Sequence, residues 1–403
     1  MRIRTWFSKI LIKYPYFPWV LGFLLPFLYI VFFLHIKKII NHSKKKDNVF
    51  VFLIGFLVVQ LISIAFSPLY SFFDFGRLAA ILHNLLGYSF VFLGYIFLND
   101  KTLFDFTKNN ILKMFYALAL IIFLGAMWSY YIGGTSYFTS LPNLLGINSK
   151  FFNVIFSIPS WHFIPDFPRT TVMSIYPNAT GLIILMVHTI YMNFHFSKPR
   201  NFQIFTFLIF ILCIFTTGSR SFLVLSVFLF MVYLINTKGK LWILVLITPI
   251  LIIIAFPLVD YMISGRQGSN EMRSLIYYNS FKFMIETNPI FGLGLKPLIP
   301  EVADKYPVGS HSTPWGYIIK CGLVGGGVIL FFYLKVILKY ILYLFKLVFS
   351  DTKLNHEKFY HYSSFFVILI ASFFEDLDAF EIMPFYFGII LWQFYRMKKE
   401  YVY

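Results

Sequence analysis

The chain has 403 residues, of which 59% are hydrophobic and only 13% are charged. A soluble domain carries about 25% charged residues, so these charges cannot cover a globule of this size, and a soluble enzyme is excluded. The 34 Lys and Arg residues outnumber the 17 Asp and Glu residues, giving a net charge of +17. In a membrane protein, basic residues that keep loops on the cytoplasmic side explain such an excess of positive charge better than binding to nucleic acid does.

Apolar runs that are long enough, or nearly long enough, to cross a bilayer follow one another along the chain. A spanning helix needs roughly 20 apolar residues, and helices satisfy their own backbone hydrogen bonds in lipid. The runs lie at 17–36, 49–66, 79–98, 111–132, 171–192, 203–218, 220–235, 241–257, 317–346, 359–374 and 384–396. The sequence therefore predicts an all-α polytopic membrane protein, a single integral membrane domain over 1–403 with about 11 or 12 transmembrane helices.

The distribution of basic residues predicts the orientation of these helices. Arg396, Lys398 and Lys399 place the C-terminus in the cytoplasm, because positively charged loops stay on that side. Alternation then places lysine-containing loops inside, at 37–48, 99–110, 193–202, 236–240 and 347–358. It also places the basic segment 1–16 outside, so that either this segment is interfacial or the count of spans is one too low, and we favour the second explanation.

Two long segments fall on the outer side, 133–170 and 258–316, and both are rich in Pro, Gly and aromatic residues. Loops of this length are uncommon unless they carry a function, so we expect the active site there, in the longer second segment. The outer side also collects basic residues, namely Arg77, Arg169, Arg220, Arg266, Arg273, Lys282, Lys296, Lys305 and His311, with Lys320 near the rim.

Arginine at the depth of a span end is costly unless it meets an anion or an aqueous cavity. A guanidinium matches two phosphate oxygens at once, so several arginines near the outer leaflet predict a site for a pyrophosphate head group. Arg220 is the strongest of these candidates, since a Gly-Ser break before it also frees backbone N–H groups. The alternative is that the arginines contact lipid phosphates or pair with carboxylates such as Asp74 and Asp166.

His311 stands in the segment 309–315, directly before a predicted span. Imidazole titrates near neutrality and can accept a proton from an attacking hydroxyl, although a loop histidine bonded to backbone is the alternative. The carboxylates of the last outer segment could bind a divalent cation, but we favour a solvated hairpin; they are Glu375, Asp376, Asp378 and Glu381.

Nothing in the sequence predicts a cofactor or a metal site. There is no phosphate-binding Gly-rich loop and no zinc spacing. The two cysteines, Cys213 and Cys321, lie in apolar runs and are interpreted as packed thiols.

Four groups of short motifs follow one another in a recognisable order. Pro168-Arg169-Thr170 precedes the motif at 176–181, and Thr217-Gly218-Ser219-Arg220-Ser221 lies between two spans. The segment 273–277 leads to Asn288-Pro289-Ile290-Phe291-Gly292-Leu293-Gly294, and His311 is followed by Gly322-Leu323-Val324-Gly325. In this order and spacing, residues 169–330 resemble the O-antigen ligase and polymerase superfamily of bacterial envelope glycosyltransferases.

The resemblance implies a GT-C-like fold and a metal-independent, inverting transfer on the outer face of the bacterial inner (cytoplasmic) membrane. The donor would be a glycan on undecaprenyl pyrophosphate. Arg220 and Arg273 would hold the pyrophosphate, Arg169 would contribute, and His311 would orient or deprotonate the acceptor hydroxyl. Ser312 stands where the family commonly has asparagine, which is a departure from its pattern.

We therefore expect a polymerase that joins lipid-linked repeat units of a capsule, an exopolysaccharide or O-antigen. Its partners would be the undecaprenyl-pyrophosphate-linked oligosaccharide and the lipid bilayer, with a chain-length regulator as a further candidate and no nucleic acid. One alternative within the superfamily is an O-antigen ligase, which transfers glycan to lipid A core. An alternative of another class is a polysaccharide transporter or flippase, although the internal repeats typical of transporters are not found.

Overall fold

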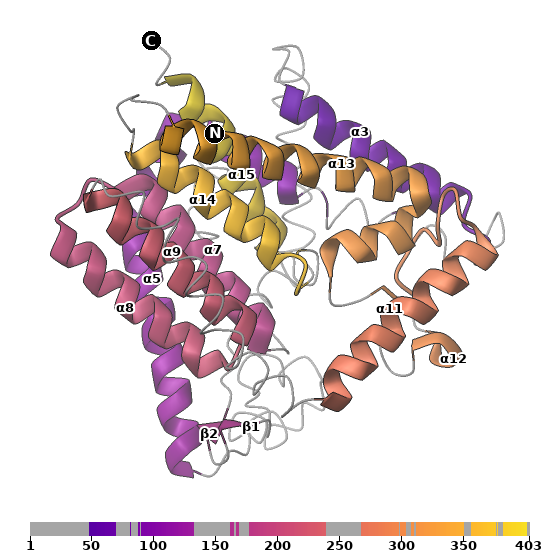
Figure 1. The fold of residues 1–403 in the computed structure, drawn as a ribbon, viewed down its shortest axis with the longest axis horizontal. Helices are drawn as coiled ribbons and strands as arrows, with labels where there is room; N and C mark the ends of the chain where they lie inside the picture. The colour runs from indigo at the N-terminus through magenta and orange to yellow at the C-terminus, as the bar shows by residue number, and fades with distance from the viewer. Residues whose placement is uncertain are drawn as a thin grey trace. The chain divides into compact units, whose positions relative to one another are not determined.

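The computed structural model describes residues 48–69, 90–132, 177–238, 267–297, 312–349, 356–375 and 382–400, with short pieces at 81, 88, 162–164, 167–168, 299–303, 308–309 and 377. These residues are almost entirely helical (Figure 1): α3 (Asn48–Ala65), α5 (Lys101–Ile132), α7 (Pro177–His195), α8 (Arg200–Thr217), α9 (Arg220–Lys238), α11 (Gln267–Thr287), α12 (Pro300–Ala303), α13 (Thr313–Phe349), α14 (His356–Ala371) and α15 (Ile382–Glu400). Two short strands, β1 (His162–Ile164) and β2 (Phe167–Pro168), pair antiparallel, with His162 opposite Pro168.

Three of the described helices are long and apolar enough to cross a membrane, over Lys101–Leu124, Arg200–Thr217 and Thr313–Phe345. Shorter apolar stretches occupy most of α3 and α9. The prediction of an all-α, multi-pass membrane protein is confirmed by these helices. The predicted spans at 17–36 and 241–257 lie outside the described residues. The number of spans, about 11 or 12, and the single membrane domain stay predictions.

Two predicted loops are partly helical: α11 lies within the outer loop predicted at 258–316, and α5 begins within the loop predicted at 99–110. We expected a cytoplasmic loop over 99–110, but α5 already begins at Lys101. The carboxylate of Asp100 accepts hydrogen bonds from the backbone N–H and the hydroxyl of Thr102, at 3.0 and 2.5 Å, which is the arrangement of a helix N-cap. Because no glycine or proline follows before Gly125, the helix continues through its polar first turns into the apolar span.

The chain divides into two compact units, one formed by 1–42, 90–230 and 379–403 and the other by 43–89 and 231–378. In the first unit α7 is the central helix and packs against α5, α8 and α15. It is buried from Ala179 to Asn193, including its polar side chains. The hydroxyl of Tyr191 donates to Gln203 at 2.8 Å, and Asn193 donates to Gln393 at 3.1 Å, so polar groups inside this helix bundle find partners on neighbouring helices.

In the second unit α13 is the longest described helix, and it contacts α3, α11 and α14. Gly322 interrupts it with φ 64° and ψ −163°, which divides α13 into a short first segment before the glycine and a long second segment after it. Figure 1 shows the long segment running beside α3. The break exposes backbone groups that need partners outside the helix, and the loop after α11 supplies them, as described below.

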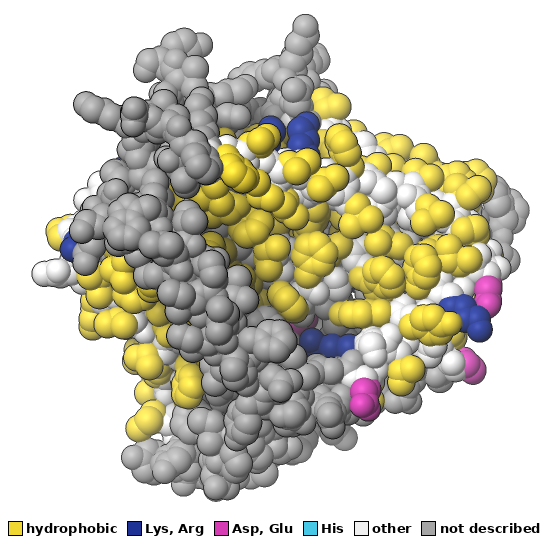
Figure 2. Space-filling model, viewed as in Figure 1, with side chains coloured by type: hydrophobic (Ala, Val, Ile, Leu, Met, Phe, Trp, Pro, Cys, Tyr) yellow, Lys and Arg dark blue, Asp and Glu magenta, His cyan; other side chains and the backbone are white. Residues whose placement is uncertain are grey.

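The outer face of α3 and α13 is apolar. Figure 2 shows hydrophobic side chains spread over both helices, and the exposed ones include Val51, Val58, Phe331, Leu334 and Leu342. An apolar patch this continuous does not face water in a monomeric soluble protein. It is the surface expected of helices that lie against lipid tails, in agreement with the composition of the chain.

Candidate functional site

Arg220 lies at the turn between α8 and α9, in the first unit. Gly218 ends α8 in the left-handed conformation (φ 60°, ψ 26°), and its N–H donates to the carbonyl of Phe215 at 2.9 Å. The carbonyl of Ser219 then accepts from the N–H of Leu223 at 2.9 Å, so Ser219 caps α9 and Arg220 is its first residue. A glycine that tolerates positive φ thus reverses the chain within two residues and places a half-buried arginine at a helix start.

A second motif packs against this turn. A Cβ on Gly181 of α7 would lie 2.8 Å from Cδ2 of Phe222 and 3.3 Å from the hydroxyl of Thr217. The motif at 176–181 and the motif at 217–221 are therefore in contact, and glycine at 181 is what allows α7 to come so close to the Arg220 turn.

Arg273 lies on α11, in the second unit, and its side chain is half-buried. Tyr277, one helical turn later on the same face, places its ring 5.9 Å from the ring of Trp315 at the start of α13. Phe281 contacts the same indole at 5.4 Å. The face of α11 that carries Arg273 is thus held against the first turn of α13.

The loop after α11 is bonded to the break in α13. Pro289 stops α11, and the N–H groups of Leu293 and Gly294 donate to the carbonyls of Ile319 and Lys320, at 3.0 and 2.8 Å. In the other direction, the N–H of Leu323 donates to the carbonyl of Pro289 at 2.9 Å. These bonds satisfy the groups that the break at Gly322 leaves without helical partners.

Two glycines make that contact possible. A Cβ on Gly292 would lie 2.6 Å from the carbonyl oxygen of Ile319, and a Cβ on Gly322 would lie 2.5 Å from the N–H nitrogen of Gly292. Both residues have positive φ, 71° and 64°. The motifs at 288–294 and 322–325 are therefore one structure, a backbone crossing in which neither glycine can carry a side chain.

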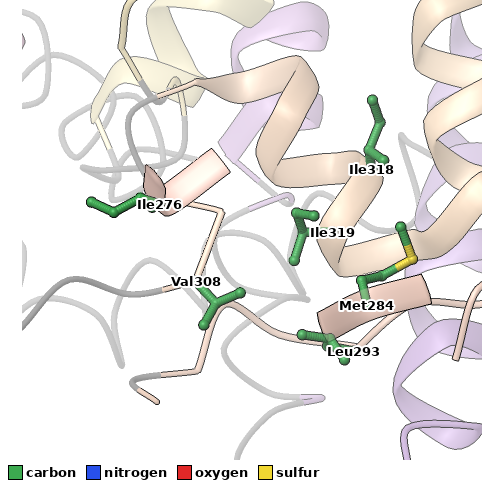
Figure 3. Packing of buried hydrophobic residues seen from close by; sticks show 6 residues of the cluster. All are labelled: Ile276, Met284, Leu293, Val308, Ile318 and Ile319. Atoms are coloured by element: carbon green, nitrogen blue, oxygen red, sulfur yellow. The ribbon is translucent and has the colours of Figure 1, made fainter. Parts of the chain in front are cut away.

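A small apolar cluster holds α11, this loop and α13 together. Figure 3 shows Leu293, Val308 and Ile319 directed toward one another, and Ile276, Met284 and Ile318 complete the cluster. All of these side chains are buried. Their burial fixes the crossing in place, at roughly 1.5–3 kcal/mol for each large side chain removed from water.

The first turn of α13 is tied to the end of α14. The N–H of Thr313 donates to the carbonyl of Ser372 at 2.8 Å. The hydroxyl of Thr313 donates to the carbonyl of Glu375 at 3.1 Å and accepts from the N–H of Leu377 at 2.7 Å. Glu375 is only 3% exposed, so the solvated hairpin that we favoured is wrong for this residue. Asp376, Asp378 and Glu381 lie outside the described residues.

We expect Thr313→Val to lower the melting temperature of the detergent-solubilised protein, while Thr313→Ser leaves it nearly unchanged. Valine keeps the shape but leaves a buried N–H and a buried carbonyl without partners, which costs about 1–3 kcal/mol for each group. The measurement is thermal unfolding, with the remaining folded protein quantified by size-exclusion chromatography after each heating step. Equal melting temperatures for the valine and serine variants would contradict this role of the hydroxyl.

The sequence-predicted site residues divide between the two units. Arg220 belongs to the first unit and Arg273 to the second, and both are half-buried; the turn of Arg220 also packs against Gly181. Arg169, which follows β2 in sequence, and His311, which precedes Ser312, lie outside the described residues. Their roles stay predictions.

The structure adds contacts that sequence reasoning missed. Gly316, on the first turn of α13, packs against the side chain of Lys296, which had been counted only among many outer cations. Lys320 is 6% exposed, with its ammonium 5.1 Å from the centre of the Tyr317 ring. His188, inside α7, stacks on Phe210 with ring centres 4.1 Å apart. Lys296 and Gly316 belong to different segments, the loop after α11 and the start of α13, so no local sequence pattern could have revealed the first of these contacts.

Among the described residues no group of three or more His, Cys, Asp or Glu side chains could hold a metal ion. Both cysteines, Cys213 and Cys321, are buried as free thiols, as predicted.

A family model described as O-antigen ligase matches residues 205–332. No curated protein and no solved structure matches the chain significantly. The matched region runs from α8 into α13 and contains Arg220, Arg273, His311 and the crossing of Gly292 with Gly322. The resemblance found in the sequence is confirmed over these residues, through which the chain is similar to the O-antigen ligase family.

Proposed function

We propose that this protein is a polysaccharide polymerase that moves a glycan from undecaprenyl pyrophosphate to a sugar hydroxyl of a second lipid-linked repeat unit. The observation that carries the proposal is the family match over 205–332, because it includes three of the four predicted site residues, Arg220, Arg273 and His311. The all-α, multi-pass fold supports it, since both substrates are anchored in the bilayer.

In the proposed reaction, the acceptor hydroxyl oxygen attacks the anomeric carbon of the donor sugar from the face opposite the pyrophosphate. A new glycosidic bond forms, the bond from the anomeric carbon to the phosphate oxygen breaks, and the configuration inverts. His311 takes the hydroxyl proton as general base. Undecaprenyl pyrophosphate leaves with the electron pair of the broken bond, so negative charge grows on its phosphate oxygens.

Arginines suit this leaving group. A guanidinium is permanently charged and can donate two parallel hydrogen bonds to phosphate oxygens, so Arg220 and Arg273 would stabilise the growing charge without a metal ion. Arg169 would contribute a third cation. Arg169 precedes α7 in the sequence, Arg220 begins α9, and Arg273 lies on α11. All three fall on the predicted outer side of the membrane, where a lipid-linked pyrophosphate would be found.

The proposed location is the bacterial inner membrane, with the site on its extracytoplasmic face. Support comes from the lysine-containing loops, which the positive-inside rule assigns to the cytoplasm. Arg220 and Arg273 then fall on the opposite side. That is the side on which lipid-linked repeat units are joined in the superfamily that the sequence resembles.

The polymerase is preferred to the ligase on composition alone. Abundant Lys, Ile, Asn and Phe suggest an AT-rich genome, which slightly favours hosts without lipid A. Both enzymes would use the same donor and the same leaving group. They differ in the acceptor, which is a lipid-linked repeat unit in one case and lipid A core in the other.

The test is an assay of the purified full chain in lipid nanodiscs with undecaprenyl-pyrophosphate-linked repeat units as its sole substrate. We expect a ladder of products that differ by one repeat, together with released undecaprenyl pyrophosphate. Transfer that requires added lipid A core would instead establish a ligase. Movement of substrate across vesicle membranes without any bond formation would establish a transporter.

A further inference from the structure

One side of α11 carries large hydrophobic side chains that no described element covers. Ile276 and Met284 mark the buried side of this helix, which is held in the cluster of Figure 3. On the opposite side, Leu275 is 58% exposed and Tyr278 is 67% exposed. The exposed hydrophobic residues of α11 are Met272, Leu275, Tyr278 and Ile285.

Charged residues stand between these hydrophobic side chains. Glu271, Lys282 and Glu286 are exposed, and the Lys282 ammonium lies 3.9 Å from the Glu286 carboxylate. A helix of this composition is too polar to cross a bilayer, and α11 is not among the described helices that could do so. Such a mixed surface suits the head-group region instead, where hydrophobic side chains reach the acyl chains and a lysine stem directs its ammonium toward water.

The outer boundary of the bilayer in the second unit follows from α3 and α13. The part of α13 from Leu323 to Phe345 is about as long as a hydrocarbon core is thick, roughly 30 Å. The loop after α11 contacts both helices at this end. The amide of Asn288 donates to the carbonyl of Phe66 at 3.0 Å, and the N–H of Leu323 donates to the carbonyl of Pro289 at 2.9 Å. This loop therefore lies at the level of the head groups, on the predicted outer side.

The hydrophobic surface of α3 and α13 continues across the loop toward α11. Phe66 is exposed, and its ring stacks on that of Phe291 with centres 4.9 Å apart. Ile290 is exposed beside Val324, whose N–H donates to the carbonyl of Ile290 at 3.3 Å. Ile285 is exposed in the last turns of α11, directly before this loop. Figure 2 shows hydrophobic side chains on this face of α3 and α13 and, at α11, hydrophobic side chains with charged ones among them.

We infer that α11 lies against the outer leaflet of the bilayer, with Leu275 and Tyr278 in contact with lipid. Lipid is the occupant because this surface continues the lipid-facing side of α3 and α13 and includes a tyrosine, a residue enriched at membrane interfaces. Arg273 lies two residues before Leu275, on almost the opposite side of the helix. Lipid contact would thus hold this arginine at head-group depth with its side chain directed away from the acyl chains.

The experiment attaches a nitroxide label to single cysteines of the full chain in phosphatidylcholine nanodiscs that each hold one copy. Leu275→Cys and Tyr278→Cys place the label on the exposed side of α11. Cys213 and Cys321 are buried, and the chain without an added cysteine measures the background labelling. The measured quantity is the ratio of the label's collision rate with dioxygen, which concentrates in lipid, to its collision rate with a water-soluble nickel chelate.

Two reference positions set the scale of this ratio. Leu334→Cys is the lipid reference, because Leu334 is exposed on the apolar face of α13. Glu301→Cys is the water reference, because Glu301 is an exposed, charged residue of the short helix α12. We expect the ratios at both α11 positions to be several-fold higher than at the water reference and to approach the lipid reference.

A polar substitution tests the contact itself. Leu275→Asp, introduced into the Tyr278→Cys chain, should lower the ratio toward the water reference, because a carboxylate is costly in the apolar part of the bilayer. Leu275→Met is the matched control and should leave the ratio unchanged, since it keeps a hydrophobic side chain of similar size. If Tyr278→Cys does not fold, Ile285→Cys provides the label on the same side of α11.

Ratios at α11 equal to that of Glu301→Cys would overturn the inference, since they would place this side of the helix in water. Low collision rates with both reagents would also overturn it, because protein would then cover the helix. Spectral broadening by a neighbouring label, seen only in nanodiscs with two copies, would identify that protein as a second copy of this chain. The inference does not depend on the proposed function, which the joining of repeat units tests separately.

Discussion

We expect His311→Ala to slow repeat-unit joining by about 10²–10⁴-fold, the range that a positioned general base contributes. Alanine cannot accept the proton of the acceptor hydroxyl, so the attacking oxygen stays protonated and weakly nucleophilic. The variant should still insert into the membrane and still bind undecaprenyl pyrophosphate, because the cations that hold the donor are intact. The measurement is the initial rate of ladder formation by purified protein, set beside donor binding.

Arg273→Ala serves as the contrasting variant. It should weaken donor binding as well as turnover, since the guanidinium touches the pyrophosphate before and during bond breaking. Arg200→Ala is the matched control, because Arg200 is exposed at the start of α8 and has no place in the proposed site. Polymer formation at the normal rate by His311→Ala would refute the assignment of the base. Failure of Arg273→Ala to accumulate would show that this arginine is structural.

The second large effect is expected at the backbone crossing. Gly322→Ala should lower the melting temperature strongly and abolish activity, because φ 64° with ψ −163° is a conformation that essentially only glycine adopts. Strain of this kind costs about 1–3 kcal/mol. In addition, the new methyl group would collide with the N–H of Gly292 and the carbonyl of Ile290, so the hydrogen bonds of the crossing would have to break.

The control for this prediction lies in the same helix. Gly327→Ala adds a methyl group that meets nothing within 4 Å, and alanine is preferred to glycine in a helix by roughly 0.5–1 kcal/mol. We therefore expect its melting temperature to stay the same or to rise. The measurement is the fraction of monodisperse protein remaining after a series of heating steps in detergent. Equal melting temperatures for the Gly322→Ala and Gly327→Ala variants would show that the crossing does not stabilise the protein.

The sequence determined the class of the protein because membrane insertion depends on local properties. A run of roughly 20 apolar residues predicts a span wherever it stands in the chain. The described helices α8 and α13 accordingly lie close to the predicted spans 203–218 and 317–346. The predicted boundary failed at α5, which begins at Lys101 and not at 111, because a hydropathy pattern marks the apolar run and not the polar turns that precede it in the same helix.

The order of the motifs also came from the sequence, and with it the resemblance to O-antigen ligases and the candidate residues. What only the tertiary structure decided was which motifs touch. Gly181 meets the turn of Arg220, Gly292 meets Gly322, and Gly316 admits Lys296. A glycine in sequence shows only that a side chain is absent. The neighbour that requires its absence comes from a distant segment, and long-range packing alone determines which segment that is.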